Sequence, residues 1–371
     1  MRRPSCYLIH FVVRSVIRYA GFVCTVTALA GSLAFAQESG GPKAPPVPNS
    51  KEESSAAEDF PGVDENPVST DFYEARQLLS KHKWVEAAIV LRSVLRVSPD
   101  FLPASVGLAT ALAYSARREE ALGILVRAAG REKGSKHTVL VHRVQVLSRL
   151  FMKSDSFQLY QDGLNFLLLK RPRQAREKFE KTLELEPDNV EVLTRDGQAL
   201  ILDGDYDSAA ERLRLAKRLN PFEPEVRLWL GRALHHRGEV SDAVVELRAA
   251  YGDLEGSELA PLWLSEALQS AGQTNAAIDM LEEDVKIQPN HLSSIVALAK
   301  IQIQTLSRDP KLRLGAARKE LLLAQSRLPL YYSDDQPHYE GELGLSMREP
   351  REEFKLEIDK LLKQVSLRLE E

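Results

Sequence analysis

Cysteine is nearly absent from this 371-residue sequence, because its two cysteines, Cys6 and Cys24, both lie within the first 36 residues. A chain that begins near Gln37 therefore has no thiol to form a disulfide or a thiolate metal site. Aromatic residues make up only 7% of the sequence, whereas 44% of the residues are hydrophobic and 27% are charged. This composition is typical of helices packed on helices, which must be stabilised by packing alone.

The sequence also lacks an excess of positive charge. The formal net charge is −4, but the first 36 residues hold four arginines and no acid, so the remainder carries 45 basic and 53 acidic residues, or −8. A protein that binds nucleic acid usually shows a basic patch or a basic overall charge. We therefore expect no nucleic-acid partner.

Motifs for catalysis or cofactor binding are missing as well. The sequence contains no Gly-x-Ser-x-Gly, no phosphate-binding loop and no His-Glu-x-x-His. His235 and His236 are adjacent, so on a helix they point about 100° apart and poorly suit a single metal ion. We expect neither an enzyme nor a metal or cofactor.

The first 36 residues have the features of a secretory leader. Four arginines up to Arg18 precede an uncharged stretch over 20–36, which ends in Ala34-Phe35-Ala36, the small-x-small pattern of a signal-peptidase site. We predict a signal peptide over 1–36 and an exported protein, periplasmic or secreted. An uncleaved membrane anchor is the alternative, since the stretch approaches the length that spans a bilayer. A mitochondrial transit peptide is a minor alternative.

The composition changes abruptly over residues 37–68. This segment is rich in Pro, Ser, Gly, Glu and Asp and has very few large apolar residues. Such a segment cannot bury a core, so we predict a disordered linker.

A period of 34 residues runs through residues 69–331. It is clearest in alanines that recur at this spacing with two longer intervals; each is followed four positions later by a large apolar residue. In most copies a small residue precedes the alanine by twelve positions, and a proline that ends the second helix follows by twelve. The alanines are Ala87, Ala121, Ala175, Ala209, Ala243, Ala277 and Ala317, and the small residues include Gly163, Gly197 and Gly231.

This pattern resembles the tetratricopeptide repeat. The resemblance implies antiparallel helix pairs that stack into a right-handed α-solenoid, so we predict an all-α fold of about seven hairpins. It also implies that the repeat alanines lie where the two helices of a hairpin touch. The predicted repeats span 68–101, 102–135, 156–189, 190–223, 224–257, 258–291 and 292–331.

The 34-residue spacing is interrupted twice. Twenty surplus residues between Ala121 and Ala175 include apolar residues at helical spacing, which predicts an extra helix over 136–155. Six surplus residues before Ala317 lengthen the turn of the last hairpin. The remainder, 332–371, reads as a polar loop and an amphipathic helix that caps the array; a coiled-coil helix is the alternative.

The resemblance further implies that the first helix of each hairpin lines a concave groove that binds a protein or peptide. Trp229 and Trp263 lie 34 residues apart, beside basic residues, and Trp and Arg are enriched at binding hot spots. The alternative is that both tryptophans pack as core between neighbouring first helices. The residues expected at the groove are Arg195, Gln198, Trp229, Arg232, His235, His236, Trp263, Glu266 and Lys300.

The sequence thus predicts a non-catalytic scaffold or assembly factor of the cell envelope that binds polypeptide partners in this groove. The alternative is an accessory or regulatory subunit of an envelope enzyme complex. If the leader stays uncleaved, residues 1–36 would also tether the protein to a membrane.

Overall fold

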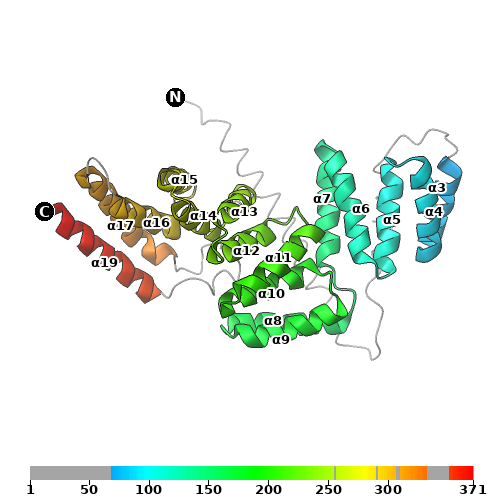
Figure 1. Ribbon diagram of the computed structural model, residues 1–371, viewed down its shortest axis with the longest axis horizontal. Coiled ribbons are helices and arrows are strands. Elements are labelled where there is room, and N and C mark those ends of the chain that lie inside the picture. The colour runs from blue at the N-terminus through cyan, green and yellow to red at the C-terminus, as the bar shows by residue number, and fades with distance from the viewer. Residues whose placement is uncertain (1–67, 255, 290, 306–309, 332–350, 371) are drawn as a thin grey trace, which may run out of the picture. The chain divides into compact units, whose positions relative to one another are not determined.

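The computed structural model describes residues 68–254, 256–289, 291–305, 310–331 and 351–370. Regular structure in these ranges consists of sixteen helices without a strand. The fold is an all-α solenoid (Figure 1), which confirms the predicted fold class. The predicted signal peptide, the linker up to residue 67 and the polar loop over 332–350 lie outside the described residues.

Seven hairpins, each of a first and a second helix, make up most of the described chain. Second helices pack against the first helix of the hairpin that follows, and α6 packs against α7 instead. The hairpins are α3 (Val68–Ser80) with α4 (Trp84–Val97), α5 (Leu102–Tyr114) with α6 (Arg118–Arg131), α8 (Ser154–Leu168) with α9 (Pro172–Leu185), α10 (Val190–Asp203) with α11 (Tyr206–Leu219), α12 (Pro224–His236) with α13 (Val240–Asp253), α14 (Leu259–Ser270) with α15 (Thr274–Ile287), and α16 (Leu292–Gln304) with α17 (Pro310–Tyr331).

Two described helices stand outside these pairs. Helix α7 (Gly134–Arg149) lies in the surplus between the second and third hairpins, packs against α6 and touches α10. Helix α19 (Arg351–Glu370) packs along α17 and touches α16. Its Phe354, Ile358 and Val365 join the core of the last hairpin, so α19 is the predicted capping helix.

Small residues set the distance between the two helices of a hairpin. A Cβ added to Gly231 would lie 2.5 Å from Cγ of Leu247, and one added to Gly163 would lie 2.4 Å from the Phe179 ring. The large residue four positions after each repeat alanine therefore fills the space opposite the glycine. The repeat alanines are all fully buried: Ala87, Ala121, Ala175, Ala209, Ala243, Ala277 and Ala317.

The first six hairpins turn through the same backbone motif. The residue five positions before the repeat alanine has a positive φ, and the next amide donates to a carbonyl five residues back, as from Glu239 to Leu234 at 3.0 Å. This is the Schellman arrangement that ends a helix in the left-handed conformation. The residues at this position are His82 (φ 56°), Ala116 (57°), Lys170 (55°), Gly204 (85°), Gly238 (81°) and Gly272 (73°).

A buried ion pair fixes the extra helix between the second and third hairpins. Arg118 of α6 and Glu186 at the end of α9 are 3% and 4% exposed, and Nη2 of the arginine lies 2.8 Å from Oε2 of the glutamate. The arginine also donates to the carbonyl of Leu150, at the end of α7. The pair therefore joins α6 and the end of α7 to α9.

Glu186 receives further hydrogen bonds in the same place. The amides of Met152 and Lys153 donate to its Oε1 at 2.9 and 3.0 Å, and the Ser156 hydroxyl donates to the same atom. Burial raises the pKa of Glu186, but the hydrogen bonds from Ser156 and Arg118 outweigh burial, so the pKa lies below its ordinary value. The carboxylate is therefore ionised and well partnered at neutral pH.

Candidate functional site

The first helices α10, α12, α14 and α16 carry all the residues expected at the groove. Each of them contacts its own second helix, and α10, α12 and α14 also touch the next first helix. Most of their side chains are consequently buried, and only a narrow band remains accessible. We call this band the first-helix strip, formed by Arg195, Arg232, His235, His236, Glu266 and Ser270.

The two tryptophans do not belong to that strip. Trp229 and Trp263 are 3% and 4% exposed, and their rings meet edge to face with centroids 4.9 Å apart. The structure therefore favours the core interpretation over the groove interpretation. Gln198, which was also expected at the surface, is only 1% exposed. The physical reason is that first helices approach one another closely, so residues at this spacing pack between them.

The arginines of the strip are neutralised by acids on the next first helix. Arg195 of α10 contacts Glu225 of α12 through both ends of its guanidinium, at 2.5 and 3.1 Å. Such a bidentate pair is geometrically specific as well as strong. Arg232 of α12 pairs with Glu266 of α14 through one guanidinium nitrogen, Nη1. The positive charges of Arg195 and Arg232 are thus already paired within the array.

Lys300 pairs with the C-terminal helix rather than with another first helix. Its Nζ is 2.7 Å from Oε1 of Glu357, which belongs to the capping helix α19. The sequence pattern placed Lys300 near the tryptophans, whereas the structure ties it to the C-terminal cap. The partner was missed because Glu357 follows the repeats and has no position in their register.

Around Arg232 the strip is built from neutral hydrogen-bonding groups. The guanidinium of Arg232 lies over the Trp263 ring, 5.1 Å from its centroid, in cation–π geometry. Nε2 of His235 is 2.9 Å from the Ser270 hydroxyl, and His236 stacks on Tyr206 at 4.4 Å. Burial lowers the pKa of both histidines and the charge of Arg232 lowers it further, so both imidazoles are neutral at pH 7.

A cluster of buried charges lies beside the strip, where α7 meets the beginnings of α10 and α12. Arg149 of α7 lies 2.6 Å from Glu223 and 3.6 Å from Glu191. The Tyr160 hydroxyl donates to Glu191 at 2.9 Å, and Arg195 contacts the same carboxylate at 2.9 Å. The extra helix is therefore tied to the first helices as well as to α6 and α9.

Sequence reasoning missed this cluster because Arg149 lies on the extra helix, outside the repeat register. One signal was available: Glu191 and Glu225 occupy the same position in adjacent repeats, 34 residues apart. Burial raises the pKa of Glu223 to about 7, which Arg149 opposes and the charges of Glu225 and Glu191 reinforce. Glu191 differs, because Arg195 and Arg149 together outweigh burial and hold its pKa below the ordinary value.

The described part of the chain lacks two features. Within it, no three or more His, Cys, Asp or Glu side chains are grouped so as to hold a metal ion. No helix in the same ranges combines the length and the apolar character needed to cross a membrane.

Two models of the tetratricopeptide-repeat family match the sequence, one over residues 166–227 and the other over 203–258. These segments include helices α9 to α13 and hence the Arg195, Arg232, His235 and His236 part of the strip. The matched residues 166–258 are tetratricopeptide repeats, as the 34-residue period predicts. No curated protein matches the sequence.

Solved structures of other helical-repeat proteins are similar in fold. MamA from Desulfovibrio magneticus has 19% identity and a TM-score of 0.43, with 48% of this chain and 99% of that chain covered. The tetratricopeptide-repeat protein TTC0263 of Thermus thermophilus has 16% identity and a TM-score of 0.43, with 56% and 99% covered. Yeast Tom70 has 15% identity and a TM-score of 0.42, with 83% and 66% covered.

Proposed function

We propose that this chain is a non-catalytic protein–protein interaction scaffold or assembly factor of the cell envelope, which binds a polypeptide along the first-helix strip. Tetratricopeptide repeats generally bind proteins or peptides, and the matched segments contain part of the strip. The observation that carries the proposal is the continuous stacking of α10, α12 and α14, which aligns the strip residues of successive hairpins.

The pairing within the strip defines the chemistry of the partner. Because Arg195 and Arg232 are each bound to a glutamate of the next helix, the strip is poorly suited to a terminal carboxylate. His235, His236 and Ser270 instead offer neutral donors and acceptors, and Leu202 at the end of α10 is 39% exposed. A polypeptide with backbone hydrogen bonds and small apolar side chains fits this surface best.

The proposal includes export of the protein from the cytoplasm. The arginine-rich leader over 1–36 supports a periplasmic or secreted protein, or one held at a membrane if the leader is retained. The charge of −8 beyond the leader supports protein rather than nucleic acid as the partner.

Affinity capture with the full chain tests the proposal. We would tag its C-terminus, recover it from the native cell envelope and identify bound proteins by mass spectrometry, which also reports whether the chain begins at Gln37. A double variant, His236→Asp with Ser270→Asp, should recover at least tenfold less partner while circular dichroism stays unchanged. The matched control, Arg248→Asp, alters an exposed residue on the second helix α13 and should recover as much as wild type.

Two outcomes would change the conclusion. Undiminished recovery by the double variant would show that the partner does not bind the strip. Recovery of a synthase or hydrolase whose activity depends on the chain would favour the alternative function, an accessory subunit of an envelope enzyme.

A further inference from the structure

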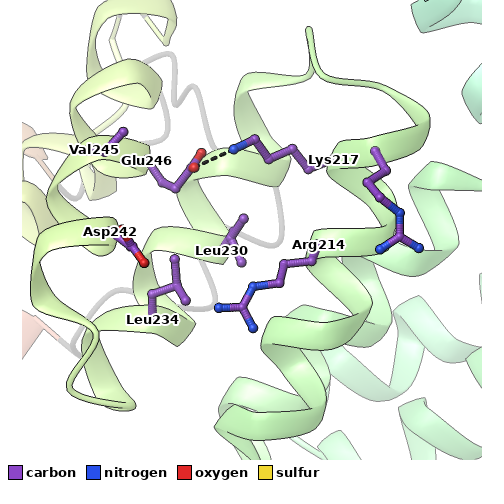
Figure 2. A pocket seen from close by; sticks show the side chains of 8 residues that line it. Arg214, Lys217, Leu230, Leu234, Asp242, Val245 and Glu246 are labelled. Carbon is purple, nitrogen blue, oxygen red and sulfur yellow. Dashed lines mark hydrogen bonds and ion pairs between the residues drawn. The ribbon is translucent and has the colours of Figure 1, made fainter.

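We propose that the array has a second binding site, on the side formed by second helices, which takes an apolar side chain flanked by carboxylates on a polypeptide partner. The site is a pocket of about 430 Å³ between α11 and α13, with α12 beneath it (Figure 2). We call it the second-helix pocket. It lies outside the first-helix strip and is independent of the function proposed for that strip.

The pocket exists because one repeat position that is apolar in most hairpins is charged in the fourth hairpin. Eight residues after the repeat alanine, five of the other six described hairpins carry an apolar residue packed against the core, such as Leu95, Leu183 or Tyr251. The fourth hairpin has Lys217 there, and its Nζ reaches across to Glu246 at 2.5 Å (Figure 2). The apolar filler between neighbouring hairpins is thus missing, and Leu230 and Leu234 of α12 form the floor of the space.

The opposite wall shows a second departure from the repeat. Two residues after the repeat alanine, the neighbouring second helices carry charges, namely Glu177, Glu211 and Asp279. Helix α13 carries Val245 instead, which is 64% exposed and lines the pocket. An exposed valine between charged positions gives the pocket an apolar rim above its leucine floor.

The charges on the α11 wall of the pocket favour a carboxylate of the partner on that side. Lys217 is paired with Glu246, and Arg214 is paired with Glu239 at 2.7 Å. Arg218 also lines the pocket, is exposed, and has no ion-pair partner among the described residues. Asp242 on the other wall lies in the first turn of α13, where the helix dipole stabilises its negative charge. Within the described ranges, Arg218 is therefore the unpaired cation of the α11 wall, and Asp242 is the unpaired carboxylate of the α13 wall, so a carboxylate of the partner would bind on the α11 side.

A leucine- or phenylalanine-sized side chain fits a pocket of this volume. Packed on Leu230 and Leu234 and against Val245, this side chain would be shielded from water. A carboxylate next to it on the partner would reach Arg218. Burial of the side chain supplies affinity and the charge pair supplies orientation. Each feature of the proposed ligand thus corresponds to a feature of the pocket.

Fluorescence anisotropy with synthetic peptides tests the proposal on the full chain. The probe is fluorescein-labelled Gly-Ser-Glu-Phe-Glu-Ser-Gly, compared with versions in which Lys replaces both Glu or Ser replaces Phe. We expect saturable binding of the first peptide, and at least fivefold weaker binding of the other two. Absent saturation, or equal binding of all three peptides, would overturn the proposal.

Matched variants locate the binding. Arg218→Glu and Val245→Asp should each weaken binding at least fivefold, and Lys217→Leu should weaken it by restoring the apolar filler. The controls Arg96→Glu and Ile89→Asp change the same two repeat positions in the first hairpin, and Ile89 is 62% exposed compared with 64% for Val245. Loss of binding in the controls as well would contradict the proposed location.

The strip variant, His236→Asp with Ser270→Asp, separates the two sites. It should bind the peptide as the wild type does, because neither residue lines the pocket. If the peptide does not bind, the proposed function of the strip is therefore unaffected. If no partner is captured, the proposed second-helix pocket is likewise unaffected.

Discussion

The hairpins up to α9 and the hairpins from α10 to α15 form the same turn from different residues. His82, Ala116 and Lys170 hold the left-handed conformation in the first group, and glycines hold it in the second. Away from glycine this conformation costs about 1 kcal/mol or more. Helix packing therefore imposes the turn, and the first three hairpins form it despite the backbone strain.

The two groups also differ inside the hairpin. Where the second group has Gly197 and Gly231 opposite a large residue, the first two hairpins have Ala75 and Ala109, both buried. The helices of the first two hairpins therefore accommodate a methyl group that those of the fourth and fifth hairpins cannot. Helix α7, which lies within the first group, links the two groups, because it is held by Arg118 with Glu186 on one side and by Arg149 with Glu223 on the other.

Breaking the first of these ion pairs should have the largest effect. Arg118→Met leaves Glu186 buried without its cation, and we expect a loss of about 3 kcal/mol in the free energy of unfolding. Urea unfolding followed by circular dichroism measures it. The control Arg131→Met removes an exposed pair from the same helix, in which the arginine is 60% exposed, and should change stability very little. Equal losses in both variants would show that Arg118 does not fix the junction.

The two buried glutamates should respond to pH in opposite directions. Glu223 has a pKa raised from 4.5 to about 7, so the folded state binds its proton more tightly than the unfolded state does. Its contribution is fully present below pH 4.5 and is lost as the pH rises through 7, by about 3 kcal/mol at most. Glu186 has a lowered pKa, so its contribution is present above pH 4.5 and is lost as the pH falls further.

Unfolding measured between pH 5 and pH 8 tests this contrast. Glu223→Gln should flatten the loss of stability over that range, because glutamine does not titrate. Glu186→Gln should instead lower stability at pH 7, since the buried Arg118 would then keep only the longer contact with Asp188, at 3.4 Å, as its counter-charge. An unchanged pH profile in Glu223→Gln would show that another group titrates there.

The close approach at Gly231 should be the next largest effect. Gly231→Ala places a methyl group 2.5 Å from Cγ of Leu247 and 3.2 Å from its backbone nitrogen, so the hairpin must open. We expect a loss of about 2 kcal/mol, measured by thermal unfolding. The control Gly252→Ala lies on α13, the second helix of the same hairpin, and its added methyl group meets nothing within 4 Å. This substitution should leave stability unchanged or raise it slightly. A stabilising Gly231→Ala would refute the packing argument.

Exchanging turn residues between the two groups should have the smallest effect. Ala116→Gly should stabilise the second hairpin by up to about 1 kcal/mol, because the left-handed turn then carries no strained side chain. Gly238→Ala should destabilise the fifth hairpin by about 1 kcal/mol for the same reason. Shifts of the same sign in both variants, seen in parallel thermal melts, would contradict a shared turn geometry.

The 34-residue period was sufficient to predict the fold class, because it records contacts that every hairpin repeats. The alanine at 243 and the glycine at 231 are fixed by one local packing geometry, so their spacing is visible in the sequence. The C-terminal cap was predictable for a similar reason, since the last hairpin needs a cover for its apolar face.

The strip was harder to predict because a period cannot distinguish burial from exposure. Trp229 and Arg232 are three residues apart on one helix, yet the first is buried and the second remains 21% exposed. Ion pairs such as Arg149 with Glu223 join the extra helix to the repeats, and no repeat register aligns them. Such partners become visible only when the helices are placed in space.

Site-specific photocrosslinking tests the central claim that a polypeptide partner lies along the first helices. A photoreactive phenylalanine would replace Ser270 on α14 in one full-length protein and Arg248 on α13 in another, each irradiated with the partner recovered by affinity capture. We expect a covalent adduct with the partner from position 270 and none from position 248. An adduct from position 248 alone would contradict it.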